Sequence, residues 1–201
     1  MRNRSVAPAS SRQHTYSILM SLLFLSRPFL LALCVLSVSA LSLCSSMPFT
    51  IRPYDPHDFS ALYKLDQSCF VPGISYSKWT LQYFLNLPSA DCLVAVDDHS
   101  HRIVGFILTE ENPPLAHIIT LDTAESHRRK GLGSALLAAM EKELQLHGVH
   151  SILLETSVEN PAAIAFWQRH GYTTEATIKR YYLGRIDAHE MRKRLPHQTP
   201  P

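Results

Sequence analysis

The residues that decide the fold form a short glycine-containing stretch in the second half of the chain. Residues 128–134 read Arg128-Arg129-Lys130-Gly131-Leu132-Gly133-Ser134 and open a long helical pattern. The glycines let the backbone turn with its N–H groups pointing outward, and the helix N-terminus adds positive charge, so the stretch predicts a phosphate or pyrophosphate site. It matches neither a P-loop nor GxGxxG, because Leu136 stands where the last glycine of GxGxxG belongs. Such turns also occur for structural reasons alone, so the elements on either side must indicate whether this stretch binds a ligand.

The patterns on both sides of this stretch predict an α/β domain built on a mixed sheet. Apolar runs bounded by turn residues are typical of strands, and they occur at 49–53, 92–96, 103–109, 115–121, 151–156, 172–179 and 187–192. Helical spacing occurs at 56–70, 77–87, 131–147 and from the N-cap Asn160 to Gly171. The strand at 151–156 is nearly all apolar and follows a helix, which predicts a buried parallel pairing.

Composition and charge narrow the class of protein. The chain has 201 residues, of which 46% are hydrophobic and 18% charged, so we expect one globular domain, alone or with an appendage. Residues 47–201 carry 15 basic and 17 acidic side chains, and this balance predicts no nucleic-acid partner. The four cysteines include no CxxC pair, which suits a reducing compartment and predicts a cytoplasmic protein.

Residues 1–46 form an apolar leader that contains four arginines and no acidic residue. Arg27-Pro28 splits its apolar part, Ile18 to Leu43, into two runs shorter than the roughly 20 residues of a membrane-spanning helix. Two interpretations stay open. The leader is either upstream sequence read from a misassigned start, with Met47 as the true start, or a signal peptide or anchor that would make the protein exported or membrane-bound. We therefore expect a domain at 47–195 and a disordered tail at 196–201.

Beyond these patterns, the sequence resembles a known superfamily. Arg128-x-x-Gly131-x-Gly133 is similar to the [Q/R]xxGx[G/A] coenzyme A loop of the GNAT (GCN5-related N-acetyltransferase) superfamily, and the resemblance covers Phe49 to Leu195. A second signature runs from Leu154 to Trp167. The tail, with Tyr181-Tyr182, Asp187-Ala188 and Met191, resembles the ribosomal-protein alanine and other protein N-terminal acetyltransferases. The resemblance implies the GNAT fold, with helices on both faces of a mixed central sheet and a splayed pair of parallel strands.

The same resemblance implies acetyl-CoA as co-substrate, without a metal. The pantetheine arm would lie between the strands near 115–121 and 151–155, held by backbone groups around Leu121 and Thr123. The stretch 128–134 would bind the pyrophosphate. The implied cofactor-binding residues are Leu121, Thr123, Arg128, Arg129, Lys130, Gly131, Leu132, Gly133, Ser134, Asn160 and Trp167.

Glu155 is the predicted catalytic base, because it occupies the position of the catalytic carboxylate in the bacterial alanine acetyltransferase. It is the only ionisable group in an apolar strand, so we expect burial to raise its pKa. His117 is the second candidate and would share the proton directly or through water. The alternative for Glu155 is an ion pair or a turn cap, and the alternative for His117 is a structural role.

Trp167 departs from the family pattern. Relatives commonly have a tyrosine there, whose phenol is thought to protonate the leaving thiolate, whereas an indole N–H does not act as an acid near neutral pH. Water, the ammonium product or another phenol such as Tyr172 would have to replace it. Trp167 also suits simple packing of the last helix.

Two segments are predicted to contact the acceptor substrate. Pro72, Ile74 and Tyr76, between the first two helices, would form a mostly apolar pocket, and Tyr181-Tyr182 would lie on its other side, unless that pair serves only cross-strand packing. Three functions remain: acetylation of a protein or peptide N-terminus, acetylation of a small amine, polyamine or lysine, and non-catalytic acyl-CoA binding. The Tyr181-Tyr182 and Asp187-Ala188 pairs favour a peptide, and the presence of Glu155 argues against a binding module.

Overall fold

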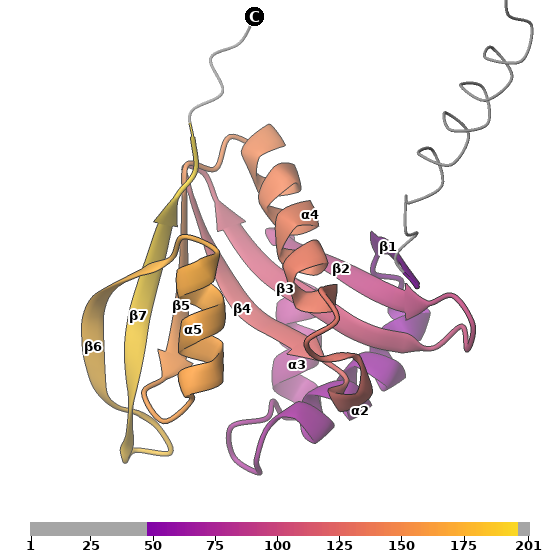
Figure 1. Cartoon of the computed structure of the whole chain (residues 1–201), viewed down its shortest axis with the longest axis horizontal. Helices are drawn as coiled ribbons and strands as arrows, with labels where there is room; N and C mark the ends of the chain where they lie inside the picture. The colour runs from indigo at the N-terminus through magenta and orange to yellow at the C-terminus, as the bar shows by residue number, and fades with distance from the viewer. Residues whose placement is uncertain (1–47, 197–201) are drawn as a thin grey trace, which may run out of the picture. The chain divides into compact units, whose positions relative to one another are not determined.

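The structure, a computed structural model, describes residues 48–196 as one seven-stranded mixed sheet with helices on both faces (Figure 1). The predicted leader and the residues from 197 on lie outside this range. Within it, no helix has the length and apolar character needed to cross a membrane. The strands follow the order β1-β2-β3-β4-β5-β7-β6. The elements are β1 (Phe49–Pro53), η1 (Pro56–Asp58), α2 (Phe59–Cys69), α3 (Lys78–Leu85), β2 (Ala90–Asp97), β3 (Ile103–Asn112), β4 (Leu115–Thr123), η2 (Glu125–His127), α4 (Leu132–Leu146), β5 (Ser151–Ser157), α5 (Pro161–Arg169), β6 (Thr173–Tyr182) and β7 (Ile186–Arg194).

The central feature of the sheet is the short parallel pairing of β4 with β5. Only three positions pair, from Leu115 with Ser151 to His117 with Leu153. Beyond them the two strands diverge, and Figure 1 shows β5 turning away with β7 and β6. All other neighbouring strands are antiparallel. The prediction of a splayed parallel pair is therefore confirmed.

A β-bulge in β4 marks the point where the strands part. Leu108 of β3 pairs with Thr120, whereas the next residue, Thr109, pairs with Ile118, so Ile119 is the extra residue. A bulge bends its strand and increases the local twist. The bulge thus helps to turn the second half of β4 away from β5.

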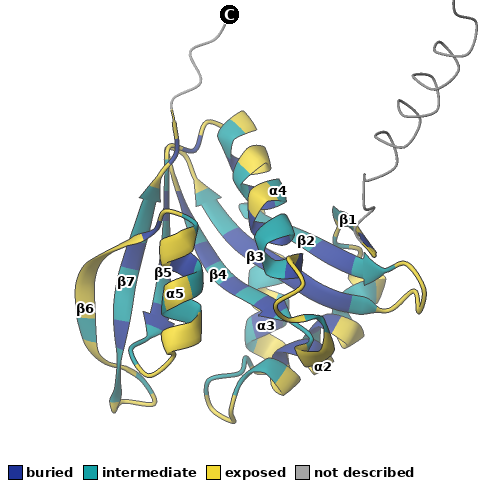
Figure 2. Ribbon diagram, in the orientation of Figure 1, coloured by how far each residue is buried: buried dark blue, intermediate teal, exposed yellow. Residues whose placement is uncertain are grey.

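The helices pack on the sheet in two groups, each with its own apolar core (Figure 2). Helices α4 and α5 cover one face, and α4 buries an apolar stripe there: Leu132, Leu136, Leu137, Met140 and Leu144. Helices α2 and α3 cover the other face through Leu62, Leu65 and Leu81. Each side thus supplies part of the apolar burial that stabilises the domain.

The helix ends follow the capping residues of the sequence. Asn160 caps α5 by accepting a hydrogen bond from the Ala163 N–H at 3.1 Å. Gly148 and Gly171 follow α4 and α5 with φ of +82° and +86°, a conformation that suits glycine at a helix C-terminus. Helix α3 ends at Leu85, two residues before the predicted end at Leu87, because the chain turns at Asn86.

Candidate active site

A hydrogen-bonded pair of ionisable side chains lies where β4 and β5 begin to separate. His117, the last paired residue of β4, places Nε2 2.7 Å from Oε2 of Glu155 on β5. Side chains alternate along a strand, and because Leu154 joins the core under α4 and α5, Glu155 points to the opposite face. The Glu155 side chain is 16% exposed and that of His117 36% exposed, so the pair is sheltered but reachable.

Two tyrosines at the end of β6 contact Glu155, and a third tyrosine contacts β4 two residues after His117. The Tyr181 hydroxyl donates to Oε2 of Glu155 at 3.3 Å, and the Tyr182 hydroxyl donates to the Glu155 backbone carbonyl at 3.2 Å. From the other side, the Tyr76 hydroxyl donates to the carbonyl of Ile119, the bulged residue of β4, at 3.2 Å. The site thus combines one carboxylate, one imidazole and three phenols.

The electrostatics of Glu155 differ from the sequence prediction. Burial is the largest single influence and raises its pKa. The hydrogen bond and charge of His117, with the Tyr181 hydroxyl, lower the pKa by more in total, so it lies below its ordinary value. The expectation of a raised pKa was wrong because it ignored the partners that the fold brings to the carboxylate. At neutral pH Glu155 is therefore ionised and able to accept a proton.

The edges of β4 and β5 beyond the paired positions offer backbone groups to a ligand. The register pairs β4 with β5 only up to His117 and Leu153, so in the described part of the sheet the later residues of each strand face no strand partner across the split. Backbone N–H and C=O groups need partners when sheltered, and an extended chain with amide groups supplies them. The pantetheine arm of coenzyme A is such a chain, so the split fits the predicted co-substrate.

The glycine-rich stretch joins β4 to α4 at the same end of the sheet as this split. Gly131 is the N-cap of α4 with φ +84°, and a Cβ added there would meet nothing within 4 Å, so its backbone conformation alone explains the glycine. Arg128 is exposed, and its Nε donates to the Thr123 carbonyl at 3.1 Å. That contact ties the stretch to the end of β4.

Gly133 lies beside α5 and the end of β4. A Cβ there would point at the Phe166 ring at 3.5 Å and at Cγ2 of Thr123 at 3.7 Å, which are ordinary contact distances. A Cβ alone would therefore fit there, and a larger side chain would extend into the space beside Phe166 of α5.

Comparison with known proteins agrees with this geometry. Residues 59–172, more than half of the chain, match the acetyltransferase (GNAT) family. The chain belongs to the GNAT family of acetyltransferases. It is similar to N-alpha-acetyltransferase 30 of Schizosaccharomyces pombe, with 29% identity over 69% of this chain and 93% of the relative. It is also similar to the ribosomal protein bS18 alanine N-acetyltransferase of Escherichia coli, with 28% identity over 70% of this chain and 91% of the relative.

Solved structures show the same fold. The crystal structure of the Escherichia coli ribosomal-protein-S18-alanine N-acetyltransferase superposes with a TM-score of 0.66 at 25% identity, over 73% of this chain and 93% of that one. A chain of the NatC complex, crystallised with Gag peptide and CoA, gives a TM-score of 0.66 at 25% identity, over 75% of this chain and 100% of that one. The GNAT fold and N-acetyltransferase activity predicted from the sequence are confirmed, and the GNAT acetyltransferases use acetyl-CoA.

Several residues predicted to bind the cofactor of this GNAT protein have visible structural roles. Leu132 is buried in the core, and the side-chain oxygen of Asn160 caps α5. Trp167 is 7% exposed and packs edge-on against Phe166 and Tyr172 at centroid distances of 4.9 and 5.3 Å. Leu121 packs partly buried against the core under α4. Arg129 and Lys130 are exposed at the loop. Cofactor contact by these residues stays a prediction.

Tyr172 does not fit the suggested role as the acid for the leaving thiolate. It is 1% exposed in the core under α4, and its hydroxyl donates to Oε1 of Glu141 at 3.1 Å. Burial, followed by the Glu141 charge, raises its pKa well above the ordinary value. The phenols beside Glu155 are Tyr181 and Tyr182 instead. Burial and the nearby carboxylate raise the pKa of Tyr181 to about 12, so it stays protonated at neutral pH.

The two predicted acceptor segments of this GNAT protein touch each other above the site. A Cβ added at Gly73 would lie 2.7 Å from Cδ2 of Leu183, so the tip of the segment after α2 meets the tip of the β6–β7 hairpin. Asp66 on α2 holds this segment by accepting from the Tyr76 N–H at 2.9 Å. Pro72 is exposed and Ile74 half-buried. Leu183 was not predicted, because no sequence pattern indicates contact between two loop tips.

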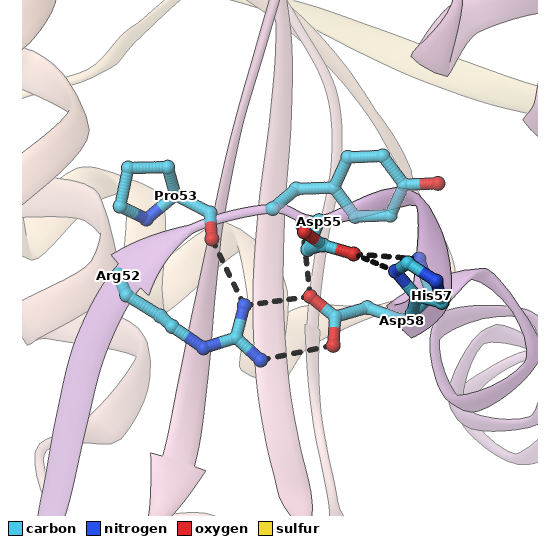
Figure 3. A pocket seen from close by; sticks show the side chains of 6 residues that line it. Arg52, Pro53, Asp55, His57 and Asp58 are labelled. Carbon is cyan, nitrogen blue, oxygen red and sulfur yellow. Dashed lines mark hydrogen bonds and ion pairs between the residues drawn. The ribbon is translucent and has the colours of Figure 1, made fainter.

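Two further clusters lie away from this site. A hollow beside β1 is lined by Arg52, whose guanidinium forms a bidentate ion pair with Asp58 at 2.6 and 2.9 Å (Figure 3). The two charged groups are hydrogen-bond partners of each other. The hollow lies at the opposite edge of the sheet from β6. The other cluster joins His147 with Glu111 at 3.0 Å and Asp91 at 3.4 Å. It lies at the ends of β2, β3 and α4, and we assign it no part in the reaction.

Proposed function

We propose that this GNAT acetyltransferase transfers the acetyl group of acetyl-CoA to the α-amine at the N-terminus of a protein or peptide. The observation that carries the proposal is the ionised Glu155, held by His117 and by Tyr181 of the β6–β7 hairpin at the split between β4 and β5. The relatives named above, which are N-terminal or alanine N-acetyltransferases, support it.

The proton affinity of Glu155 favours an α-amine over a lysine side chain. An α-amine has a pKa of about 7.7–8.0 and lysine one of about 10.4, so at pH 7.5 about a third of α-amines but only about 0.1% of lysine amines are neutral. A carboxylate whose pKa lies below its ordinary value is a weak base. Such a base suffices for a group that is already partly neutral.

The roles of the residues follow from their positions. Bound acetyl-CoA supplies an activated thioester carbonyl that an amine attacks directly. Glu155, with His117 hydrogen-bonded to it, accepts the proton that the amine loses. The Tyr181 and Tyr182 hydroxyls hold this carboxylate in place through its side chain and its backbone carbonyl. Tyr181 is also near enough to Glu155 to relay a proton toward the leaving thiolate.

The test compares acceptor classes on the full chain. The protein is incubated with labelled acetyl-CoA and three sets of acceptors: short peptides with free N-termini, the same peptides with a blocked N-terminus and an internal lysine, and polyamines. The first set should be acetylated with a kcat/KM at least tenfold above the others. Faster acetylation of blocked lysine peptides or polyamines would overturn the proposal and leave the GNAT assignment intact.

A further inference from the structure

A second histidine contacts the glycine-rich stretch from outside the catalytic pair. His170, directly after α5, places Nδ1 2.8 Å from the Phe166 carbonyl oxygen and Nε2 2.9 Å from Oγ of Ser134. Its ring also packs on the Phe166 ring at a centroid distance of 4.4 Å. Ser134 lies in the first turn of α4 and ends the stretch 128–134. The reaction at Glu155 uses none of these contacts.

The two hydrogen bonds determine where the protons lie. A carbonyl oxygen only accepts, so Nδ1 of His170 must carry a hydrogen. When the ring is neutral, Nε2 is then an acceptor and Ser134 must donate its hydroxyl hydrogen to it. The Ser134 oxygen would then present only lone pairs to a phosphate. When the ring is protonated, Nε2 donates to Ser134 and the hydroxyl hydrogen becomes free to turn toward a phosphate oxygen.

We infer that His170 is a proton-linked positioning residue for the pyrophosphate of acetyl-CoA, which takes up a proton when the co-substrate binds and thereby turns the Ser134 hydroxyl into a donor. The inference rests on the proposed binding of acetyl-CoA at residues 128–134. A pyrophosphate brings negative charge beside Ser134, and nearby negative charge favours the protonated imidazole. Binding of the cofactor and binding of the proton are then linked.

Within the described part of the chain, no carboxylate pairs with this imidazole. Among residues 48–196, the ring of His170 forms hydrogen bonds with the Phe166 carbonyl and the Ser134 hydroxyl. The charged groups beside it at the end of α5 and before α4 are the cations Arg169, Arg128, Arg129 and Lys130, which oppose a charged ring. Further along α4 stand Lys142, Glu143 and Glu141, the last in an ion pair with Lys193 of β7 at 2.6 Å. Since Glu141 is paired with Lys193, the co-substrate's phosphates are the anions that would stabilise the charged ring.

Calorimetry on the full chain tests the linkage. Titrating acetyl-CoA at pH 7 in buffers of different ionisation enthalpy measures the protons taken up per site. Wild type should take up a measurable fraction of one proton, and its affinity for acetyl-CoA should weaken by about tenfold from pH 6 to pH 8. His170→Gln, which keeps a polar side chain without a titratable proton, should lose the proton uptake that His170 supplies and show a shallower pH dependence of binding than wild type.

Three controls separate positioning from structure. Ser134→Ala should lower the affinity for acetyl-CoA. Adding His170→Gln to this variant should lower the affinity little further, because the two residues act through one hydroxyl. Acetyl-pantetheine, which lacks the pyrophosphate, should show no His170-dependent proton uptake. His57→Gln, a change at an exposed histidine beside β1, should behave as wild type.

The outcomes distinguish the two proposals. Equal proton uptake by wild type and His170→Gln, or equal effects of His170→Gln on acetyl-CoA and acetyl-pantetheine, would overturn the role of His170 while acetylation persists. Failure of wild type to bind acetyl-CoA at all would overturn the proposed function as well. If His170→Gln does not fold, the proton uptake of Ser134→Ala decides, since it should fall below that of wild type.

Discussion

Replacing Glu155 by glutamine tests the proposed chemistry most directly. Glutamine keeps the shape and one oxygen that accepts from His117 and Tyr181, but it removes the charge and the ability to take a proton. General base catalysis contributes about 10²–10⁴-fold, so turnover on a peptide should fall by that factor, about 2.7–5.5 kcal/mol in activation free energy. The affinity for acetyl-CoA should stay similar. Glu159→Gln, the same change at an exposed residue four positions on, is the matched control.

The pH dependence makes this prediction sharper. In wild type the pKa of Glu155 lies below its ordinary value, so loss of activity from its protonation should appear only below about pH 4.5. In Glu155→Gln the rate should rise with pH up to about 8, as more of the α-amine arrives neutral, and the deficit against wild type should shrink. In His117→Ala, which should cost less activity, the effect of burial on the pKa of Glu155 is opposed only by the Tyr181 and backbone hydrogen bonds, so the acidic limb of the pH–rate profile should move to higher pH. An unchanged rate and an unchanged profile in Glu155→Gln would refute the assignment of Glu155 as the base.

Four further outcomes follow from the sequence and the structure. Residues 47–201 alone should be soluble, bind acetyl-CoA and keep the activity of the full chain, and loss of binding in this truncation would contradict a misassigned start. Gly133→Val should weaken acetyl-CoA binding in calorimetry and also lower the Tm, because its side chain would press on Phe166. Trp167→Tyr should raise turnover if a phenol at this position protonates the leaving thiolate, as the family resemblance implies. It should also cost about 1 kcal/mol of stability in the buried core, which thermal unfolding measures. No gain in turnover would show that another group supplies the proton. Asp122 is buried, one of its carboxylate oxygens lacks a hydrogen-bond partner among the described residues, and burial raises its pKa to about 7. The stability of the folded protein should therefore fall as pH rises from about 4 to 7. Asp122→Asn should have a higher Tm than wild type at pH 7 but not at pH 4.

Much of the fold could be predicted because its signals are local. The apolar stripe of α4, the capping oxygen of Asn160 and the glycines after α4 and α5 each depend on residues within a few positions of one another. Helix and strand patterns repeat over short windows, so they survive without knowledge of the rest of the chain. The end of α3 differs from the prediction, since the helix stops at Leu85 and the chain turns at Asn86 although the helical spacing continues to Leu87.

The candidate site could be predicted only in part. Glu155 and His117 were chosen from the family resemblance, but their separation of 38 positions in the chain becomes a 2.7 Å hydrogen bond only because β4 and β5 run parallel for three residues and then part. The lowered pKa of Glu155 and the exclusion of Tyr172 both depend on neighbours that the fold supplies.

The sequence by itself determined the element order, the glycine-bearing start of α4 and the family to which the chain belongs, because these depend on residue type and spacing along the chain. Only the tertiary structure decided which groups face one another: Tyr76 with the bulge at Ile119, the Gly73 tip with Leu183, and His170 with Ser134. The physical reason is that hydrogen bonds and charge interactions act over a few ångströms in space. Distances of that size between residues far apart in the chain exist only after the sheet and its helices have packed.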